Sequence, residues 1–438
     1  MKHLLFVHTA GDARPYVERL RALGFRASLI KRCPNASDQA CFDATFDIDY
    51  QEDLSAALAC AVDLNRRDPV DGVLSFSESG VLGASFIAEH LGLPANAPAA
   101  ALRARNKYLM RTAMRDAGLP TPEFHLVNSA QQARSILQQH DRPMVLKPIS
   151  GSSSYGVVRL MPEDGLDTIA AHVESVRTYI DSYREENPQY PFEFWLPEAG
   201  RGIASADVFD PREHFLLEGF IPGQQVSVDG IVSDGEVSCF GVIEIERIKD
   251  EDYFLEYEEW MPTHLGSARE EAIQDAAASA VRALGLRNSC FHCELKIDGD
   301  AICVLEIAAR RGADNIADFL HSLHGIDIYA EGALIASGQP RNYPRRHPQG
   351  AMKMRYFLPE KSGIIARIDG IDDVQSDPRL SELCLDFSVG ERVLIPPDGF
   401  EFLGYMSVCA ADLPGADAAL ESLYSRVVFH IDTDPITS

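Results

Sequence analysis

Two glutamates within residues 289–316 have the type and the spacing that a metal site requires. Glu294 and Glu306 lie in two runs rich in Ile, Val, Leu and Phe, and Asp298-Gly299-Asp300 between the runs is a turn signal. The pattern predicts a β-hairpin. Because side chains alternate along a strand, a loop with an odd number of residues would place Glu306 nearly opposite Glu294. Neighbouring carboxylates repel each other unless a cation lies between them, and Mg²⁺ favours oxygen ligands.

A fixed positive charge follows the second glutamate. Arg310 stands four residues after Glu306 and is followed by Arg311 and Gly312. Carboxylates, a guanidinium group and a glycine turn together indicate a site of phosphoryl transfer. The alternative is a surface hairpin whose charged side chains are only solvated.

A lysine at the mouth of a Gly/Ser-rich loop is the second candidate for chemistry. Residues 142–147 have the pattern of a buried strand that ends at Lys147 and continues directly into the loop 149–156. Backbone N–H groups of such a loop can surround phosphate oxygens, and Lys147 would add positive charge. Gly-Lys-Ser/Thr does not close the loop, which excludes a Walker-type motif. A flexible hairpin connection is the alternative, but the lysine favours phosphate binding.

The composition limits the class of protein that positions these groups. The chain has 438 residues, enough for roughly two to four domains, and helical and strand-like segments alternate, which predicts an α/β and α+β multidomain fold. A net charge of −26 argues against nucleic-acid binding and permits an amine-bearing partner. No apolar run is long enough for a membrane span or a secretion signal. Nine cysteines without disulfide-like spacing indicate reduced thiols in the cytoplasm.

The remaining segments divide the chain into regions. Residues 1–95 have the pattern of a βα domain, in which Glu78 is expected to cap a helix rather than contact substrate. Residues 100–118 form one predicted helical stretch. Residues 163–215 predict a helix followed by an insertion or lid, and residues 350–438 predict a separate small α+β domain without a catalytic cluster.

An acidic run mixed with aromatic residues occupies residues 249–260 and includes Glu256 and Glu259. Acidic runs are most often solvated loop faces. The neighbouring Tyr, Phe and Trp side chains also allow a second interpretation, a pocket for an ammonium group.

The order of these motifs over residues 1–338 resembles the ATP-grasp superfamily. The motifs are Arg105-Asn106-Lys107 before Gly118-Leu-Pro-Thr-Pro, Val145-Leu-Lys147-Pro with the Gly/Ser loop, Leu217-Glu218-Gly-Phe-Ile-Pro-Gly, Glu294, and Glu306-Ile-Ala-Ala-Arg310. The chain is most similar to the L-amino acid ligase branch, which makes dipeptides or related amides. A small domain follows the matching part, and Phe254-Leu-Glu256 with Pro262-Thr263 looks like the substrate loop of that branch.

The resemblance implies an ATP-grasp fold between an N-terminal βα domain and a small C-terminal α+β domain. Residues 96–215 would form the small subdomain with its insertion, and residues 216–340 the large subdomain with the metal site. The flanking domains would be residues 1–95 and 350–438.

The resemblance also implies roles for individual residues. The phosphates of ATP would meet Lys107, Lys147, Ser150, Gly151, Ser152, Ser153, Ser154 and Gly156. The adenosine of ATP would meet Glu218, Phe220, Ile221 and Gln225. Two Mg²⁺ ions, or Mn²⁺, would bind Glu294 and Glu306. The substrates and the acyl phosphate would meet Glu256, Glu259, Arg310 and Gly312, with Arg310 as the catalytic residue.

Several positions depart from the pattern of the superfamily. Ala308 stands where an asparagine metal ligand is usual, so water or Asn315 would have to replace it. Gln225 replaces a glutamate expected to contact ribose, and Ala313 replaces a glycine. Glu259 stands where some relatives have histidine in the substrate loop, which indicates a changed substrate.

Together these observations predict an ATP-dependent carbon–nitrogen ligase that acts through an acyl phosphate and releases ADP and phosphate, with an amino acid as at least one substrate. Two alternatives stay open. One is an ATP-grasp ligase or carboxylase for a different substrate, and the other is an ATP-binding regulatory protein without catalysis, which Ala308 would explain. The resemblance to the superfamily also suggests a homodimer. The sequence does not predict which carboxylate and which amine are joined.

Overall fold

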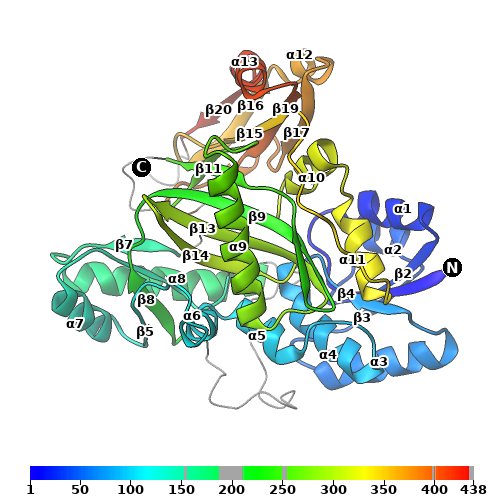
Figure 1. The fold of residues 1–438 in the computed structure, drawn as a ribbon. Helices are drawn as coiled ribbons and strands as arrows, with labels where there is room; N and C mark the ends of the chain where they lie inside the picture. Colours follow the sequence, from blue (N-terminus) through cyan, green and yellow to red (C-terminus); the bar gives the residue numbers. More distant parts are fainter. Residues whose placement is uncertain are drawn as a thin grey trace.

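The structure is a computed structural model that describes residues 1–151, 154, 156–186, 210, 212–248, 254–396, 399 and 401–433. Within these ranges the strands form four sheets that are flanked by helices (Figure 1). The segment after residue 186 that was expected to form an insertion or lid lies mostly outside the described residues.

A parallel four-stranded sheet in the order β3-β2-β1-β4 opens the chain. Its strands are β1 (Lys2–Val7), β2 (Phe25–Lys31), β3 (Ala44–Asp47) and β4 (Gly72–Leu74). Its helices are α1 (Arg14–Ala22), α2 (Ala36–Cys41), α3 (Leu54–Arg67) and α4 (Val81–Leu91), with a 3₁₀ turn, η1 (Glu78–Gly80). Helices pack on both faces of β1, which explains its run of buried apolar residues.

The single helical stretch predicted for residues 100–118 is wrong, because two helices occupy it. α5 (Pro98–Arg105) ends where Asn106 adopts an extended conformation, and α6 (Lys107–Asp116) begins immediately after it. The side chain of Asn106 caps α6 by accepting hydrogen bonds from the N–H groups of Tyr108 and Leu109. The break makes Lys107 the first residue of α6, where its side chain is buried.

An antiparallel sheet in the order β5-β8-β6-β7 follows. Its strands are β5 (Phe124–Val127), β6 (Met144–Pro148), β7 (Val158–Leu160) and β8 (Phe215–Gly219). Its helices are α7 (Ala130–His140) and α8 (Leu166–Glu186), and apolar side chains of both join those of the strands in one core cluster. The strand predicted before the Gly/Ser loop is confirmed by β6, although its last residue is Pro148 and not Lys147.

A nine-stranded sheet forms the centre of the molecule, in the order β14-β13-β9-β11-β12-β15-β19-β17, with β10 beside β9. Its first six strands in the chain are β9 (Gln224–Ser233), β10 (Glu236–Cys239), β11 (Ile243–Arg247), β12 (Glu256–Met261), β13 (Ser289–Asp298) and β14 (Ala301–Ala308). α9 (Ser267–Leu284) crosses the face of β13 and β14 (Figure 1), and α10 (Ile316–His324) and α11 (Ile328–Ala336) follow the hairpin.

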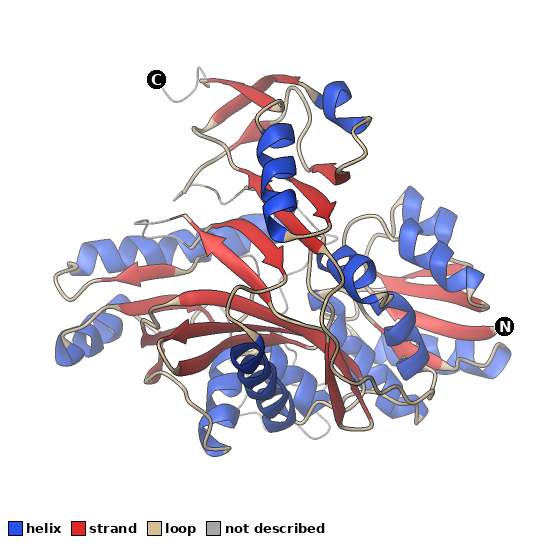
Figure 2. Cartoon of the chain, turned by 45° about the horizontal axis from the view of Figure 1, so that its top comes forward, coloured by secondary structure: helices blue, strands red, loops and turns tan. Residues whose placement is uncertain are grey.

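The C-terminal part, predicted as a small α+β domain, contains strands and helices and shares the central sheet with the rest of the chain. β15 (Ala351–Phe357), β17 (Leu380–Leu385) and β19 (Gly404–Ala410) extend the central sheet, and β15 pairs directly with β12. The remaining strands, β16 (Gly363–Asp369), β18 (Arg392–Val393) and β20 (Val428–Asp432), form a small sheet. Two helices accompany them, α12 (Ile371–Gln375) and α13 (Leu413–Tyr424), and Figure 2 shows the latter against the strands of this part.

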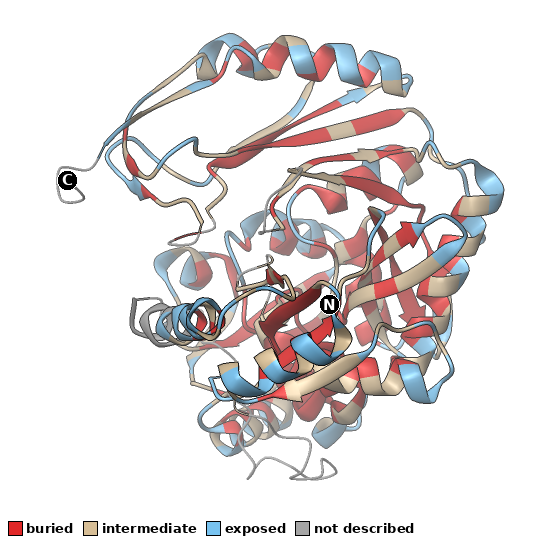
Figure 3. Cartoon of the chain, turned by 90° about the vertical axis from the view of Figure 1, so that its left-hand side faces the viewer, coloured by how far each residue is buried: buried red, intermediate tan, exposed pale blue. Residues whose placement is uncertain are grey.

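Burial follows the layers of the fold. The strands of the central sheet are largely buried, whereas the helices expose one face to solvent (Figure 3). All nine cysteines are free thiols. Among the described helices, none combines the length and the apolar composition needed to cross a membrane.

Candidate active site

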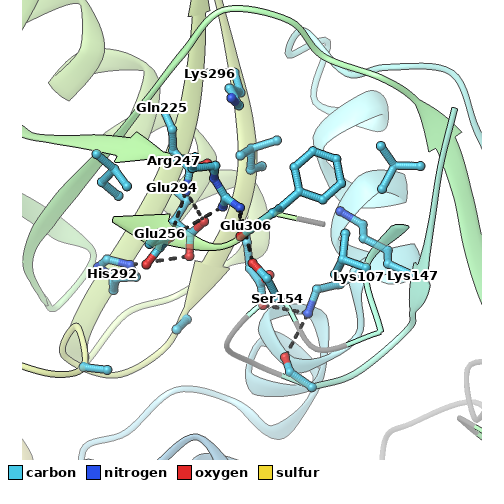
Figure 4. Close-up of a pocket in the computed structure, with 18 of the residues that line it drawn as sticks. Lys107, Lys147, Ser154, Gln225, Arg247, Glu256, His292, Glu294, Lys296 and Glu306 are labelled. Carbon is cyan, nitrogen blue, oxygen red and sulfur yellow. Dashed lines mark hydrogen bonds and ion pairs between the residues drawn. The ribbon is translucent and has the colours of Figure 1, made fainter. Parts of the chain in front are cut away.

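One cavity of about 420 Å³ brings together most of the residues predicted to have a functional role (Figure 4). It is lined by Lys107, Lys147, Ser150, Gly151, Ser154, Glu218, Phe220, Ile221, Gln225, Glu256, Glu259, Glu294, Glu306 and Arg310. Gly156 and Gly312 do not line it. Ser152 and Ser153 lie outside the described residues.

The two hairpin glutamates stand directly opposite each other, as predicted, but for a different reason. The loop between Asp298 and Ala301 has two residues, not an odd number. Leu305 has no partner on β13, and this β-bulge shifts the register so that Glu294 pairs with Glu306. Without the bulge the even loop would have set Glu306 off by one position and turned it to the other face.

The surroundings of Glu294 favour its ionised form. Its carboxylate accepts a hydrogen bond from Gln225 Nε2 at 3.0 Å, and His292 Nε2 lies 3.7 Å away. Burial alone would raise the pKa of Glu294, but the neighbouring imidazole of His292 lowers it to about 2. Its partner Glu306 accepts a hydrogen bond from Lys107 Nζ at 2.8 Å. A pair of facing carboxylates fits a hard divalent cation.

No third metal ligand is found near this pair at the positions that the sequence suggested. Ala308 is buried and offers only a methyl group. Asn315 is buried behind the cavity, where its amide donates to Asp318 and Glu382, so it does not replace the missing asparagine. Within the described part of the hairpin, the two glutamates are therefore the candidate metal ligands.

The two lysines expected to bind phosphate, Lys107 and Lys147, are held by ion pairs. Lys147 Nζ lies 2.6 Å from Glu218, and Arg111 on α6 binds the same carboxylate through Nε at 2.7 Å. Burial would raise the pKa of Glu218, but the two cations lower it to about 2. Burial lowers the pKa of Lys147, and Glu218 opposes that shift. Lys107 Nζ also donates to the carbonyl of Gly151, which ties it to the Gly/Ser loop.

The ion pairs around Glu218 limit which groups of this segment can contact adenine. The carboxylate of Glu218 is engaged by two cations, so its side chain is not free for a base. The N–H of Phe220 donates to the carbonyl of Pro143 at 3.2 Å. Gly219, Phe220 and Ile221 of this segment line the cavity.

Arg310 is held by a residue of the 3₁₀ turn η1 in the N-terminal part of the chain. Its Nε lies 2.6 Å from Glu78 Oε2, and Arg105 binds the other oxygen of the same carboxylate at 2.5 Å. Burial would raise the pKa of Glu78, but the two arginines lower it to about 2. The expectation that Glu78 caps a helix is therefore wrong: its carboxylate binds two arginines.

Gly312 supports the cavity from behind. Its N–H donates to Asp229 Oδ1 at 2.9 Å, and the other oxygen of Asp229 lies 2.9 Å from His292 Nδ1. A Cβ at Gly312 would come within 2.5 Å of Ile316 and 2.8 Å of Asp229, so no larger side chain fits. The glycine thus permits the contact that orients His292.

Several lining residues were not found from the sequence. They are Arg247, His292, Lys296, Asp314, Tyr356, Asp386 and Phe402. His292 and Lys296 alternate with Glu294 along one strand, and that period of two was a usable signal. Tyr356 and Asp386 come from the C-terminal part, for which nothing local indicated a role.

Protein-family models match three segments of the chain. They are the ATP-grasp N-terminal domain at residues 17–95, the ATP-grasp domain at residues 203–318 and the L-amino acid ligase C-terminal domain 2 at residues 355–432. The crystal structure of an L-amino acid ligase from Bacillus licheniformis superimposes with a TM-score of 0.81 at 20% identity and covers 99% of both chains.

Two curated relatives have named activities. Carnosine synthase 1 of Mus musculus is 26% identical over 80% of this chain and 41% of its own length. Alanine--anticapsin ligase of Bacillus subtilis is 27% identical over 59% of this chain and 52% of its own length. The chain thus spans about half or less of the length of these relatives.

The chain has the fold of the L-amino acid ligase structure and two segments that match ATP-grasp domain models, which confirms the resemblance seen in the sequence. More particularly, the segment that follows the ATP-grasp match is similar to the C-terminal domain 2 of L-amino acid ligases.

Proposed function

We propose that this chain is an ATP-dependent carboxylate–amine ligase that forms an amide bond, with an amino acid as at least one substrate. One observation carries the proposal: a single cavity holds Lys107 and Lys147 for phosphate, the pair Glu294 and Glu306 for a divalent metal, and Arg310 for an anionic reaction centre. The named activities of the relatives, among them an alanine ligase and a carnosine synthase, belong to the same reaction class.

The lysines and the Gly/Ser loop would bind the triphosphate of ATP. Lys107 and Lys147 enter the cavity from α6 and β6 and lie together on one side of it in Figure 4. The apolar side chains of Val145, Phe220 and Ile221 line the cavity and offer a surface for the adenine ring.

The facing glutamates would hold Mg²⁺, or Mn²⁺ in its place. Ionised Glu294 and its partner Glu306 supply carboxylate oxygens of the kind these ions bind, and paired carboxylates can bridge two ions. Bound metal would supply charge neutralisation for the transferred phosphoryl group.

The proposed reaction has two steps. An oxygen of the substrate carboxylate attacks the γ-phosphorus of ATP, the bond from that phosphorus to ADP breaks, and an acyl phosphate forms. The nitrogen of the amine then attacks the acyl carbon, phosphate leaves, and the amine loses a proton to solvent or to a nearby carboxylate. Arg310, whose Nε is held by Glu78, would stabilise the negative charge that develops on the acyl group and its phosphate.

Phosphate release measured with a panel of amino acids and carboxylates tests this proposal. Release that requires both a carboxylate and an amine, with the amide identified by mass spectrometry, is expected. The variant Arg310→Ala should lose product formation and keep ATP binding, measured by calorimetry. Unchanged product formation by Arg310→Ala would contradict the role of that arginine.

Ala308 favours a second candidate, an ATP-binding regulatory protein, because a ligand of the metal is absent at that position. Nucleotide binding without phosphate release across the whole panel would support this candidate. The variant Ala308→Asn restores an asparagine at the ligand position and further separates the ligase from the regulatory protein. If the chain is already an active ligase, this variant should bind metal more tightly without acquiring a new activity.

Two further predictions accompany the proposal. A homodimer is expected from the habit of the superfamily and would appear as a doubled mass in sedimentation experiments. A cytoplasmic location is expected because all nine cysteines are free thiols.

A further inference from the structure

The charges that line the cavity are unevenly matched. Most of its cations are held by carboxylates: Lys107 by Glu306, Lys147 by Glu218, Arg310 by Glu78 and Arg247 by Glu256. Three other lining carboxylates, Glu259, Asp314 and Asp386, have no cationic partner among the residues that the structure describes. The excess of negative charge therefore lies apart from the lysines.

These three carboxylates form the end of the cavity that the C-terminal part closes. Glu259 comes from β12, Asp314 from the turn before α10, and Asp386 from the segment after β17. Tyr356 on β15 joins them, and its ring packs 4.6 Å from the ring of Phe402. In Figure 4, Glu256, Glu294 and His292 are grouped apart from Lys107 and Lys147.

A single hydroxyl group serves two of the carboxylates. Tyr356 Oη lies 2.7 Å from Asp314 Oδ2 and 3.4 Å from Glu259 Oε1. Because a phenol donates only one proton, it satisfies Asp314 and leaves Glu259 poorly bonded. The residue is only 3% exposed, and its other oxygen, Oε2, is buried without any hydrogen-bond partner. A buried acceptor without a donor is costly, and a donor bound in the cavity would remove the cost.

The local backbone fixes the position of Asp314. Its φ is +46°, in the left-handed region that aspartate and asparagine tolerate better than most residues. Burial and the neighbouring charges of Glu256 and Asp314 raise the pKa of Glu259 well above its usual range, which is the response of crowded acids without a counter-ion.

We propose that the amino acid substrate of this ligase carries a cationic side chain, an ammonium or guanidinium group, and that Glu259 and Asp314 bind it beside Tyr356. The inference rests on the proposed function and names the class of its substrate. A cation here would meet two carboxylates and two aromatic rings. A neutral or acidic side chain would leave the carboxylates unmatched, and rejecting it would give the site its selectivity.

Arginine and citrulline test the proposal because they have nearly the same shape and differ in charge. Phosphate release is measured with each as the varied amino acid, and product is identified by mass spectrometry. The wild-type protein is expected to favour arginine over citrulline, and lysine over norleucine, by about 30-fold or more in kcat/KM. This is the effect expected when one partner of a buried charge pair is removed.

Variants at the acidic end locate the effect. Asp314→Asn keeps a residue that tolerates the left-handed backbone and removes the charge, so it should reduce the preference for arginine over citrulline at least tenfold. Glu259→Gln should act in the same direction. Asp373→Asn on exposed α12 is the matched control and should not change the preference. Calorimetry with arginine and with citrulline gives the same comparison without turnover.

The outcomes separate this inference from the proposed function. If no amino acid supports phosphate release, the proposed function fails. If amino acids are ligated but citrulline and norleucine are used as well as arginine and lysine, or if Asp314→Asn and Glu259→Gln leave the preference unchanged, the ligase stands and the cationic substrate is refuted.

Discussion

Glu294 and Glu306 are direct cross-strand partners, and a bulge at Leu305 holds them in that relationship. A regular ladder across a two-residue loop would pair Glu294 with Leu305 instead. The bulge therefore sets the spacing of the proposed metal ligands, and the first prediction tests them.

Replacing either hairpin glutamate should abolish metal-dependent turnover. Glu294→Gln and Glu306→Gln remove a charged ligand but keep the shape of the side chain, so phosphate release should fall on the order of 100-fold or more because charge neutralisation by the metal is lost. Binding of Mn²⁺, followed by electron paramagnetic resonance, should weaken in both variants. Glu271→Gln on the exposed face of α9 is the control. Full metal binding by both hairpin variants would show that the ligands lie elsewhere.

Glu78 should act as a positioning residue for Arg310. Glu78→Gln keeps a hydrogen-bonding group but leaves Arg310 and Arg105 without the carboxylate that both contact. A small displacement of Arg310 should lower kcat by roughly 100-fold, while ATP affinity changes little. Steady-state kinetics with calorimetry separates the two effects.

The conservative variant Arg310→Lys distinguishes positioning from simple loss of stability. If Glu78 acts through Arg310, the double variant Glu78→Gln with Arg310→Lys should be little worse than Arg310→Lys alone. Independent, multiplying losses would contradict that coupling.

Short-range patterns were enough to predict the parts of the site that lie on single elements. The strand before Lys147 and the two strands around the hairpin turn are local, so their composition and alternation predicted them. Arg111 could not be predicted in the same way. It lies on a helix where an arginine is usually solvated, and only the tertiary fold brings Glu218 and the carbonyl of Val304 to it.

The errors have a similar cause. The bulge at Leu305 depends on pairing between strands, which the residues of one strand do not encode. The Pro- and Arg-rich segment 339–349 predicted a boundary before the C-terminal domain, but it did not predict that the two parts share a sheet. In the structure β15 joins the central sheet through backbone hydrogen bonds, which leave no trace in the residue types.

Glu218 should contribute to stability in a pH-dependent way. Its pKa in the folded protein is about 2, below the ordinary 4.5, because Arg111 and Lys147 outweigh the effect of burial. A lowered pKa means that the unfolded chain takes up the proton first, so the contribution is complete above pH 4.5 and disappears as the pH falls toward 2. Glu218→Gln should therefore cost about 3–5 kcal/mol at pH 7, the cost of breaking a buried ion pair, and less in acid.

Urea denaturation at a series of pH values measures this difference. Glu236→Gln on β10, whose side chain is exposed, should show no comparable loss. A Glu218→Gln deficit that stays constant from pH 7 to pH 3 would mean that the carboxylate is not ionised in the folded protein.

The last prediction concerns Arg355, which connects the C-terminal part to β12, the strand that carries the proposed substrate-binding residues Glu256 and Glu259. On β15, Arg355 stands directly opposite Glu258 of β12, and its guanidinium binds that buried carboxylate as well as Glu421 on α13. Arg355→Met keeps the apolar stem and leaves Glu258 with Lys353 alone, so the free energy of unfolding should fall by about 3 kcal/mol.

Because Glu256 and Glu259 lie on β12 beside Glu258, the same variant should also raise KM for the amino acid substrate, whereas KM for ATP should hardly change. Arg367→Met on β16 is the matched control: its side chain is mostly exposed and bound to an exposed aspartate, so its effect on stability should stay within about 0.5 kcal/mol. Equal effects of Arg355→Met and Arg367→Met on unfolding and on KM would mean that β15 does not support the substrate end of the cavity. The joint loss of stability and amino-acid affinity is expected because one strand pair, β12 with β15, both completes the sheet and forms that wall.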